Sequence, residues 1–159
     1  MPQLSLNSLK VLETVHPDLQ AVVNRCVSEF PLQLVVDQGN RTAEDEMALW
    51  LQCHNKDGSP NGKPHLTGCN GYAIGTTAPN GCAGSGISNH QGGLAVDIVV
   101  EVNGDIIWNG EDDVYKELAF SMKKAAAELN IPMTWGGDFE PPSAPDWDHF
   151  ELVKVFYPN

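Results

Sequence analysis

Apolar residues recur at helical spacing in two parts of the chain. Between residues 11 and 30 they form one stripe with a period near 3.6, and Pro17 suits the first turn of a helix there. Residues 112–130 repeat the pattern, with inward positions expected at Val114, Leu118, Met122, Ala125 and Leu129. The second stripe ends at Ile131, because the residue before a proline disfavours helical backbone. Both segments are therefore expected to be amphipathic helices with one buried face.

Shorter apolar runs predict strands. Residues 32–36 form an aliphatic run, and residues 94–102 form the clearest strand of the chain. Asn103-Gly104 is a strong hairpin signal, so residues 105–108 are expected to return beside the preceding strand. Two more strands are expected near the end of the chain, at residues 133–135 and 149–155.

A third helix and a long loop complete the pattern. Thr42 with Asp45 predicts a helix start, and the helix should run to about Gln52. Residues 53–87 are rich in Gly, Asn, Pro, Ser and Thr without periodicity, which predicts a long loop. The order of elements favours an α+β fold, with helices packed on a mostly antiparallel sheet in one domain that covers residues 1–159.

The composition and charge of the chain argue against some classes of binding partner. The 159 residues are 42% hydrophobic and 19% charged, as in an ordinary globular domain. A net charge of −12 argues against binding nucleic acid or an anionic membrane surface. No apolar run is long enough to span a bilayer, and residues 1–10 lack the pattern of a secretory signal. We therefore expect a protein that stays in the cytoplasm in which it is made.

The four cysteines predict little chemistry. Cys26 lies on an apolar helical face and is expected to be a buried thiol. The others fall in the predicted loop beside His54 and His65; they are Cys53, Cys69 and Cys82. Free thiols are the default, while a disulfide or a structural zinc in the loop stays open. Residues 57–62 resemble a calcium loop but lack its closing carboxylate, so a turn is expected.

Two polar clusters contain the residue types of a catalytic zinc site. His90 follows the predicted loop, Asp97 lies inside an apolar strand, and His149 opens the last predicted strand. Two imidazoles and a carboxylate can hold zinc and leave a fourth position for water. A buried carboxylate needs a partner, and for Asp97 the alternative to a metal is a salt bridge. Gly92 and Gly93 would let the chain turn so that His90 and Asp97 converge.

Asp146, three residues before His149, is the candidate general base. Residues three apart on a regular strand face opposite sides, so both cannot serve one site from the same strand. The proline-rich residues 141–145 are expected to keep Asp146 in a loop, with the strand beginning near His149. Asp148 should then face away, as a solvated charge or a hydrogen-bond acceptor.

Four segments resemble zinc peptidases that cleave bacterial cell-wall peptides. These are the D-alanyl-D-alanine carboxypeptidases and the L-alanyl-D-glutamate endopeptidases of phage endolysins. Their Ser-x-His-x-x-Gly-x-Ala-x-Asp and Asp-x-x-His patterns are filled here by Ser88, His90, Gly93, Ala95, Asp97, Asp146 and His149. Their Gly-x-Arg-Ser/Thr and Trp-Gly-Gly-Asp segments correspond to residues 39–42 and 135–138. The chain departs from relatives at Glu46, where Gln is frequent, and in a long insertion between Trp50 and Ser88.

The resemblance implies a hedgehog/DD-peptidase-like fold and a monomeric enzyme with one zinc ion, held by His90, Asp97 and His149. Asp146 would be the base, and Arg41 would hold a substrate carboxylate or stabilise the oxyanion. Ser88 would support the first ligand, and Trp147 could line the substrate groove, whereas Trp135 is expected in the core. The implied activity is cleavage of the L-alanyl-D-glutamate bond of peptidoglycan stem peptides by an endolysin, which reaches the wall and lyses bacteria after another protein breaches the membrane.

Three other interpretations remain open. The same fold and metal could serve a D-alanyl-D-alanine carboxypeptidase, because the cleft walls that set specificity are not readable from sequence. A zinc-containing binding module without turnover would be favoured by a fourth protein ligand on the metal. Two imidazoles and a carboxylate also suit iron in oxygenases, although the remaining motifs do not point there.

Overall fold

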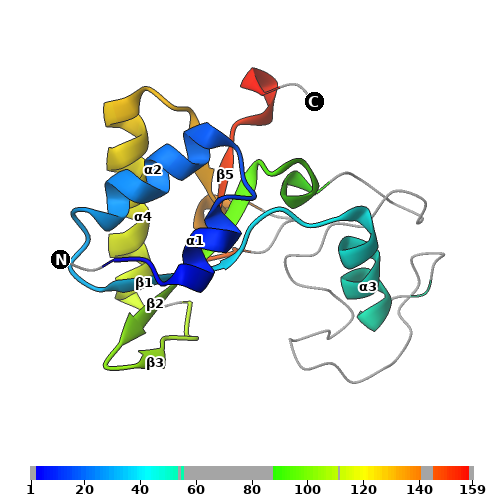
Figure 1. Cartoon of the computed structure of the whole chain (residues 1–159), viewed down its shortest axis with the longest axis horizontal. Helices are drawn as coiled ribbons and strands as arrows, with labels where there is room; N and C mark the ends of the chain where they lie inside the picture. Colours follow the sequence, from blue (N-terminus) through cyan, green and yellow to red (C-terminus); the bar gives the residue numbers. More distant parts are fainter. Residues whose placement is uncertain (1–2, 54, 56–87, 111, 141–144, 158–159) are drawn as a thin grey trace.

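The computed structural model describes residues 3–53, 55, 88–110, 112–140 and 145–157 (Figure 1). Its helices are α1 (Leu6–Leu12), α2 (Pro17–Val27), α3 (Ala43–Cys53) and α4 (Asp113–Leu129). Its strands are β1 (Gln33–Gln38), β2 (Ala95–Val102), β3 (Asp105–Ile106), β4 (Met133–Trp135) and β5 (His149–Leu152). Short 3₁₀ helices are η1 (Asn89–Gly92), η2 (Gly136–Asp138) and η3 (Lys154–Phe156). The predicted α+β class is confirmed.

The sheet is antiparallel, and β2 lies inside it. The strand order is β1-β2-β5-β4, and β3 pairs with the end of β2. Val35 is opposite Val99 in the β1–β2 ladder, and Asp97 is opposite His149 in the β2–β5 ladder. Helices α2 and α4 pack against each other, whereas α3 lies on the other side of the molecule from them (Figure 1).

The two faces of β2 have different roles. Val96, Ile98 and Val100 are buried in the main hydrophobic core together with residues of α2 and α4. Because side chains alternate along a strand, Asp97 points to the opposite face, between Ala95 and Val99. Phe150 and Leu152 of β5 are likewise completely buried in the core, which leaves His149 on the face of Asp97. The core thus sets which side of the sheet carries the polar residues.

The apolar stripe of residues 11–30 belongs to two helices rather than one, while Pro17 lies in the first turn of the second helix, as expected. α1 ends at Leu12 and α2 begins at Pro17, with the His16 side chain accepting the Asp18 backbone N–H. The cause is Pro17, which has no N–H for an intrahelical bond and disfavours helical backbone at His16. Leu12 and Val15 are still buried, so the stripe marked a continuous apolar face across two helices.

Other boundaries also differ from the sequence predictions. β3 ends at Ile106, and Trp108 is 73% exposed instead of paired in a strand. β5 ends at Leu152, where the expected strand to residue 155 gives way to η3. Leu129, expected to face inward, is 40% exposed in the last turn of α4. Each error lies at an end of a helix or strand. There the apolar pattern stops, so the sequence gives no further residues that would fix the boundary.

Several local predictions are confirmed. The Asp45 backbone N–H donates to Thr42 Oγ1, and Thr42 donates back to the Asp45 carboxylate, at the start of α3. Asn103 and Gly104 have φ angles of 54° and 91°, as the hairpin signal requires. The predicted loop beyond α3, with Cys69, Cys82 and the calcium-like residues 57–62, lies outside the described residues. No helix in the described part of the chain is long and apolar enough to cross a membrane.

Cys26 is buried as expected, and burial raises the pKa of its thiol to about 12. A thiol with so high a pKa stays protonated and unreactive at neutral pH. Cys26 is therefore a packing residue of α2.

Core packing of α4 yields a stability prediction. Leu118 is fully buried, so Leu118→Ala should lower the free energy of unfolding by about 2–5 kcal/mol. Phe120 on the same helix is 72% exposed, so Phe120→Ala should change it by less than about 0.5 kcal/mol. Urea denaturation followed by circular dichroism measures both. Equal effects of the two substitutions would mean that α4 does not pack as described.

Candidate metal centre and active site

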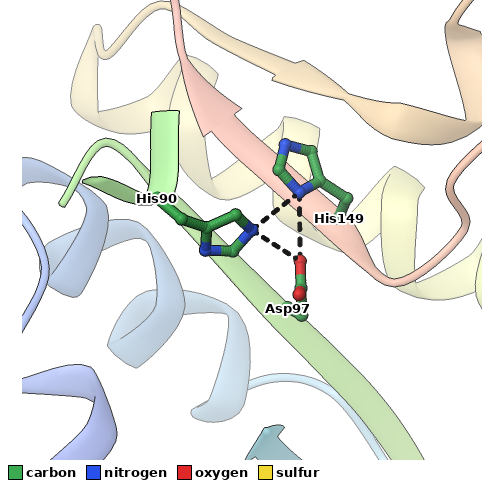
Figure 2. A group of neighbouring side chains, drawn as sticks. All are labelled: His90, Asp97 and His149. Carbon is green, nitrogen blue, oxygen red and sulfur yellow. Dashed lines mark hydrogen bonds and ion pairs between the residues drawn. The ribbon is translucent and has the colours of Figure 1, made fainter. Parts of the chain in front are cut away.

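His90, Asp97 and His149 come together on the polar face of the sheet (Figure 2). His90 Nε2 lies 3.2 Å from His149 Nδ1 and 3.2 Å from Asp97 Oδ1. His149 Nδ1 lies 3.0 Å from the same carboxylate oxygen. The sequence therefore identified three residues from η1, β2 and β5 that the fold brings into one triangle.

The triangle fits a tetrahedral metal. Zinc bonds of roughly 2.0–2.1 Å to nitrogen and oxygen place neighbouring ligand atoms about 3.3–3.4 Å apart. The three measured separations, 3.0–3.2 Å, are within a few tenths of an ångström of that spacing. Two imidazoles and one carboxylate are also the donor types that catalytic zinc sites use. Among the described residues, this group of three is the cluster able to hold a metal ion.

The outer nitrogens of both rings carry the protons. His90 Nδ1 donates to the Gly39 carbonyl oxygen at 2.8 Å, and His149 Nε2 donates to Glu151 Oε2 at 3.0 Å. When both imidazoles are neutral, each has one N–H, and these bonds leave His90 Nε2 and His149 Nδ1 as lone-pair donors. In that state three electron-rich atoms face one another, and a cation between them would stabilise the arrangement.

The pKa values of His149 and Asp97 also show that a positive charge is favoured between these side chains. Burial opposes the imidazolium, but hydrogen bonds to Asp97 and Glu151 outweigh it and raise the pKa of His149 to about 10. Burial likewise opposes ionisation of Asp97, yet the two histidines hold the pKa of its carboxyl well below the usual range. A proton on His149 therefore occupies the place of a metal, and metal binding would release it.

His90 is held by the loop that carries it. Ser88 caps η1 by accepting the His90 backbone N–H, and Gln91 completes the capping box. Gly93 then reverses the chain with a φ of 66°, a conformation that glycine adopts without the strain of a side chain. Ser88 therefore holds the backbone of His90 through the capping hydrogen bond.

Arg41 borders the cluster. Its Nη2 lies 3.6 Å from Asp97 Oδ2, and its backbone N–H donates to the His90 carbonyl oxygen at 3.0 Å. The side chain is 12% exposed, so its positive charge acts in a partly buried environment. Such a guanidinium can bind a carboxylate or stabilise a developing oxyanion.

Asp146 lies in a turn ahead of β5, as the proline-rich segment predicted. Its backbone N–H donates to the Gly136 carbonyl oxygen at 3.0 Å. A Cβ on Gly136 would collide with Asp146 and would come within 3.0 Å of the His149 Cβ, so only glycine allows this approach. The first glycine of the Trp-Gly-Gly-Asp segment is therefore required for steric reasons, because it lets the turn of Asp146 pack beside His149.

Asp148 is not a solvated surface charge, which was one of its two expected roles. Burial, the charge of Asp97 and a hydrogen bond with Asp146 raise the pKa of Asp148 to about 8. At neutral pH the protonated Asp148 can donate to the Asp146 carboxylate.

The two nearby tryptophans stack against each other. Trp135 is 7% exposed, in the core as expected, and its Nε1–H donates to the Trp147 carbonyl oxygen at 2.9 Å. The ring centroids are 5.5 Å apart in an edge-to-face arrangement. Trp147 is half-buried and packs against the border of the core next to Asp146.

Glu151 and Asn89 are site residues that the sequence reasoning missed. Glu151 accepts a hydrogen bond from His149, and Asn89 donates to the same carboxylate oxygen. The available signal was the spacing, because residues 149 and 151 of one strand must face the same side. The contact with Asn89, which is 62 positions away, had no signal in the sequence.

Comparison with known proteins agrees with this geometry. The family model described as phage L-alanyl-D-glutamate peptidase matches residues 2–153. The crystal structure of the Serratia marcescens L-Ala D-Glu endopeptidase ChiX is similar, with a TM-score of 0.69 and 24% identity over 99% of this chain and 95% of that chain. The vancomycin resistance D,D-dipeptidase VanXYg, in complex with a D-Ala-D-Ala phosphinate analogue, has a TM-score of 0.54 and 21% identity over 87% of this chain and 50% of that chain.

The two structures establish the fold, while the family assignment comes from the sequence model. No curated protein sequence matches the chain significantly. The family match covers nearly all of the 159 residues and includes every candidate site residue from Arg41 to His149. The expected fold and family are confirmed: the chain belongs to the phage L-alanyl-D-glutamate peptidase family.

Proposed function

We propose that this protein is a zinc-dependent endolysin that hydrolyses the L-alanyl-D-glutamate bond of peptidoglycan stem peptides. The observation that carries the proposal is the convergence of three ligand atoms, from His90, Asp97 and His149, in a member of this peptidase family. We further propose that residues 1–159 act as one monomeric domain. It would be made in the host cytoplasm and reach the wall after the membrane is breached.

Each residue of the candidate site can be assigned a role in the proposed hydrolysis. Zinc, when bound, would polarise the scissile carbonyl and lower the pKa of a water molecule to about 7. Asp146 accepts a proton from the attacking water and returns it to the leaving amine. Arg41 stabilises negative charge on the carbonyl oxygen or holds a carboxylate of the substrate. Ser88 supports the His90 backbone, and Trp147 contacts the substrate.

The donor count favours an enzyme over a binding module. A structural zinc is normally enclosed by four protein ligands, whereas a catalytic zinc has three and one open position. In the described part of the chain the cluster supplies three donors, with a candidate base and a guanidinium beside them. A D-alanyl-D-alanine carboxypeptidase is the second candidate, because the VanXYg dipeptidase shares the fold.

Metal dependence and bond specificity can be tested together. Purified peptidoglycan digested by zinc-loaded protein should release fragments with new L-alanine carboxyl and D-glutamate amino termini, identified by mass spectrometry. A chelator should abolish these fragments, and added zinc should restore them. Loss of one terminal D-alanine would instead establish the carboxypeptidase, and no metal-dependent product from several wall chemotypes would favour the binding module.

The role of Asp146 predicts a separation of binding from turnover. Asp146→Asn removes the proton acceptor but leaves the three donors, so kcat/KM should fall by about 10²–10⁴ while zinc stays bound. Asp105→Asn, at the exposed start of β3, removes the same charge away from the site and is the control. Wall turbidity and zinc content are measured on the same samples. Full activity of Asp146→Asn would rule out its assignment as the base.

Arg41 can be tested against the chain's other arginine. Arg41→Ala should lower kcat/KM by about 10²–10³ if the guanidinium stabilises developing charge. A rise in KM with kcat unchanged would assign it to holding a substrate carboxylate. Arg25→Ala is the control, because Arg25 forms ion pairs with Glu29 and Glu128 on the helical side of the molecule. Unchanged kinetics of Arg41→Ala would remove Arg41 from the site.

A further inference from the structure

We infer that Glu151 and Asn89 are positioning residues that select the metal-binding tautomer of His149 and thereby set the zinc affinity of the site. This inference rests on the proposed function, because it concerns the same three ligands. It assigns a role to two residues outside the ligand set, the base and the guanidinium.

The support is a short chain of hydrogen bonds. His149 Nε2 donates to Glu151 Oε2 at 3.0 Å, and Asn89 Nδ2 donates to the same oxygen at 2.7 Å. The side chains of His149 and Glu151 are 9% and 21% exposed, so water competes little for these bonds. An asparagine amide nitrogen has no lone pair to offer, so it holds Glu151 as an acceptor toward the ring.

When metal binding displaces one proton of His149, two carboxylates compete for the single N–H that remains on the ring. Asp97 Oδ1 lies 3.0 Å from Nδ1, and Glu151 Oε2 lies 3.0 Å from Nε2. If the proton sits on Nδ1, it points at Asp97 and blocks the lone pair that a metal needs. Glu151, supported by Asn89, favours the proton on Nε2 and leaves Nδ1 free. The acceptor on the outer nitrogen therefore decides whether the ring is a ligand.

The backbone makes this support rigid. Glu151 is paired with Ala95 of β2 on one side and with Thr134 of β4 on the other. Asn89 directly precedes His90, and its carbonyl oxygen accepts the Leu94 N–H. One carboxylate thus joins the segment of the first histidine to the strand of the second, so a change at Glu151 should disturb metal binding more than it disturbs the fold.

Zinc affinity measured without substrate tests the inference. The wild type and the variants Glu151→Ala, Glu151→Gln and Asn89→Ala are titrated with zinc against a chelating indicator. Glu151→Ala should bind zinc about 10–100-fold more weakly than the wild type. Glu151→Gln should recover most of the loss, because its amide oxygen can accept the Nε2–H. Asn89→Ala should fall between wild type and Glu151→Ala. Glu117→Gln on the exposed face of α4 is the charge control and should match the wild type.

A second measurement separates positioning from a merely structural role. The melting temperature of the metal-free protein should be nearly the same in all variants, whereas its rise on adding zinc should shrink in Glu151→Ala. If Glu151→Ala fails to fold, Asn89→Ala and Glu151→Gln carry the test. Zinc affinities within twofold of the wild type for all three variants would overturn the inference while leaving the proposed function intact. A wild type that binds no zinc would overturn both.

Discussion

The antiparallel pairing of β2 with β5 is the constraint on which the candidate site depends. Asp97 and His149 are direct partners in this ladder, so their side chains leave the same face of the sheet close together. A register shift of one residue would turn His149 into the core and expose Phe150 and Leu152, which are now fully buried. Burial of each such side chain is worth about 1.5–3 kcal/mol. The hydrophobic core therefore sets the distance between two of the three donors.

The third donor depends on contacts outside the sheet. His90 lies in η1, and its ring is oriented by the Gly39 carbonyl oxygen. The corner between α1 and α2 supports both segments: Thr14 Oγ1 accepts the Asn40 backbone N–H, and the His16 backbone N–H donates to Gly93. The N-terminal helices thus hold the loops around His90 in place. A site that looks like a local motif in the sequence is assembled by three distant parts of the chain.

Most of the elements could be predicted from the sequence because periodicity carries that information directly, and the three candidate ligands were predicted from residue type together with the family motifs. Pro17 was correctly placed in the first turn of a helix. The gap between α1 and α2 was missed because the apolar stripe continues across it, and a stripe shows which face is buried rather than whether the helix is continuous. One of the two roles predicted for Asp148 was a solvated surface charge, because alternation along a strand would turn its side chain away from the site. It lies instead in the turn before β5, where alternation does not apply. The partnership of Glu151 with Asn89 is a tertiary contact that no local pattern could report.

The charges around the three donors explain why such a site can exist in a folded protein. Hydrogen bonds from His149 and Asn89 outweigh burial and lower the pKa of Glu151, so this carboxyl is ionised together with Asp97. Asp148, with a pKa of about 8, holds its proton at neutral pH. In the metal-free protein the two ionised carboxylates flank the imidazolium of His149, whose pKa is about 10, and the guanidinium of Arg41 lies 3.6 Å from Asp97. A divalent cation at the three donor atoms would take the place of the proton on His149 Nδ1 as the positive charge beside Asp97. Metal binding, the protonation of His149 and the nearby arginine are therefore parts of one charge balance around Asp97, and removing any one of them changes the charge that the others must balance.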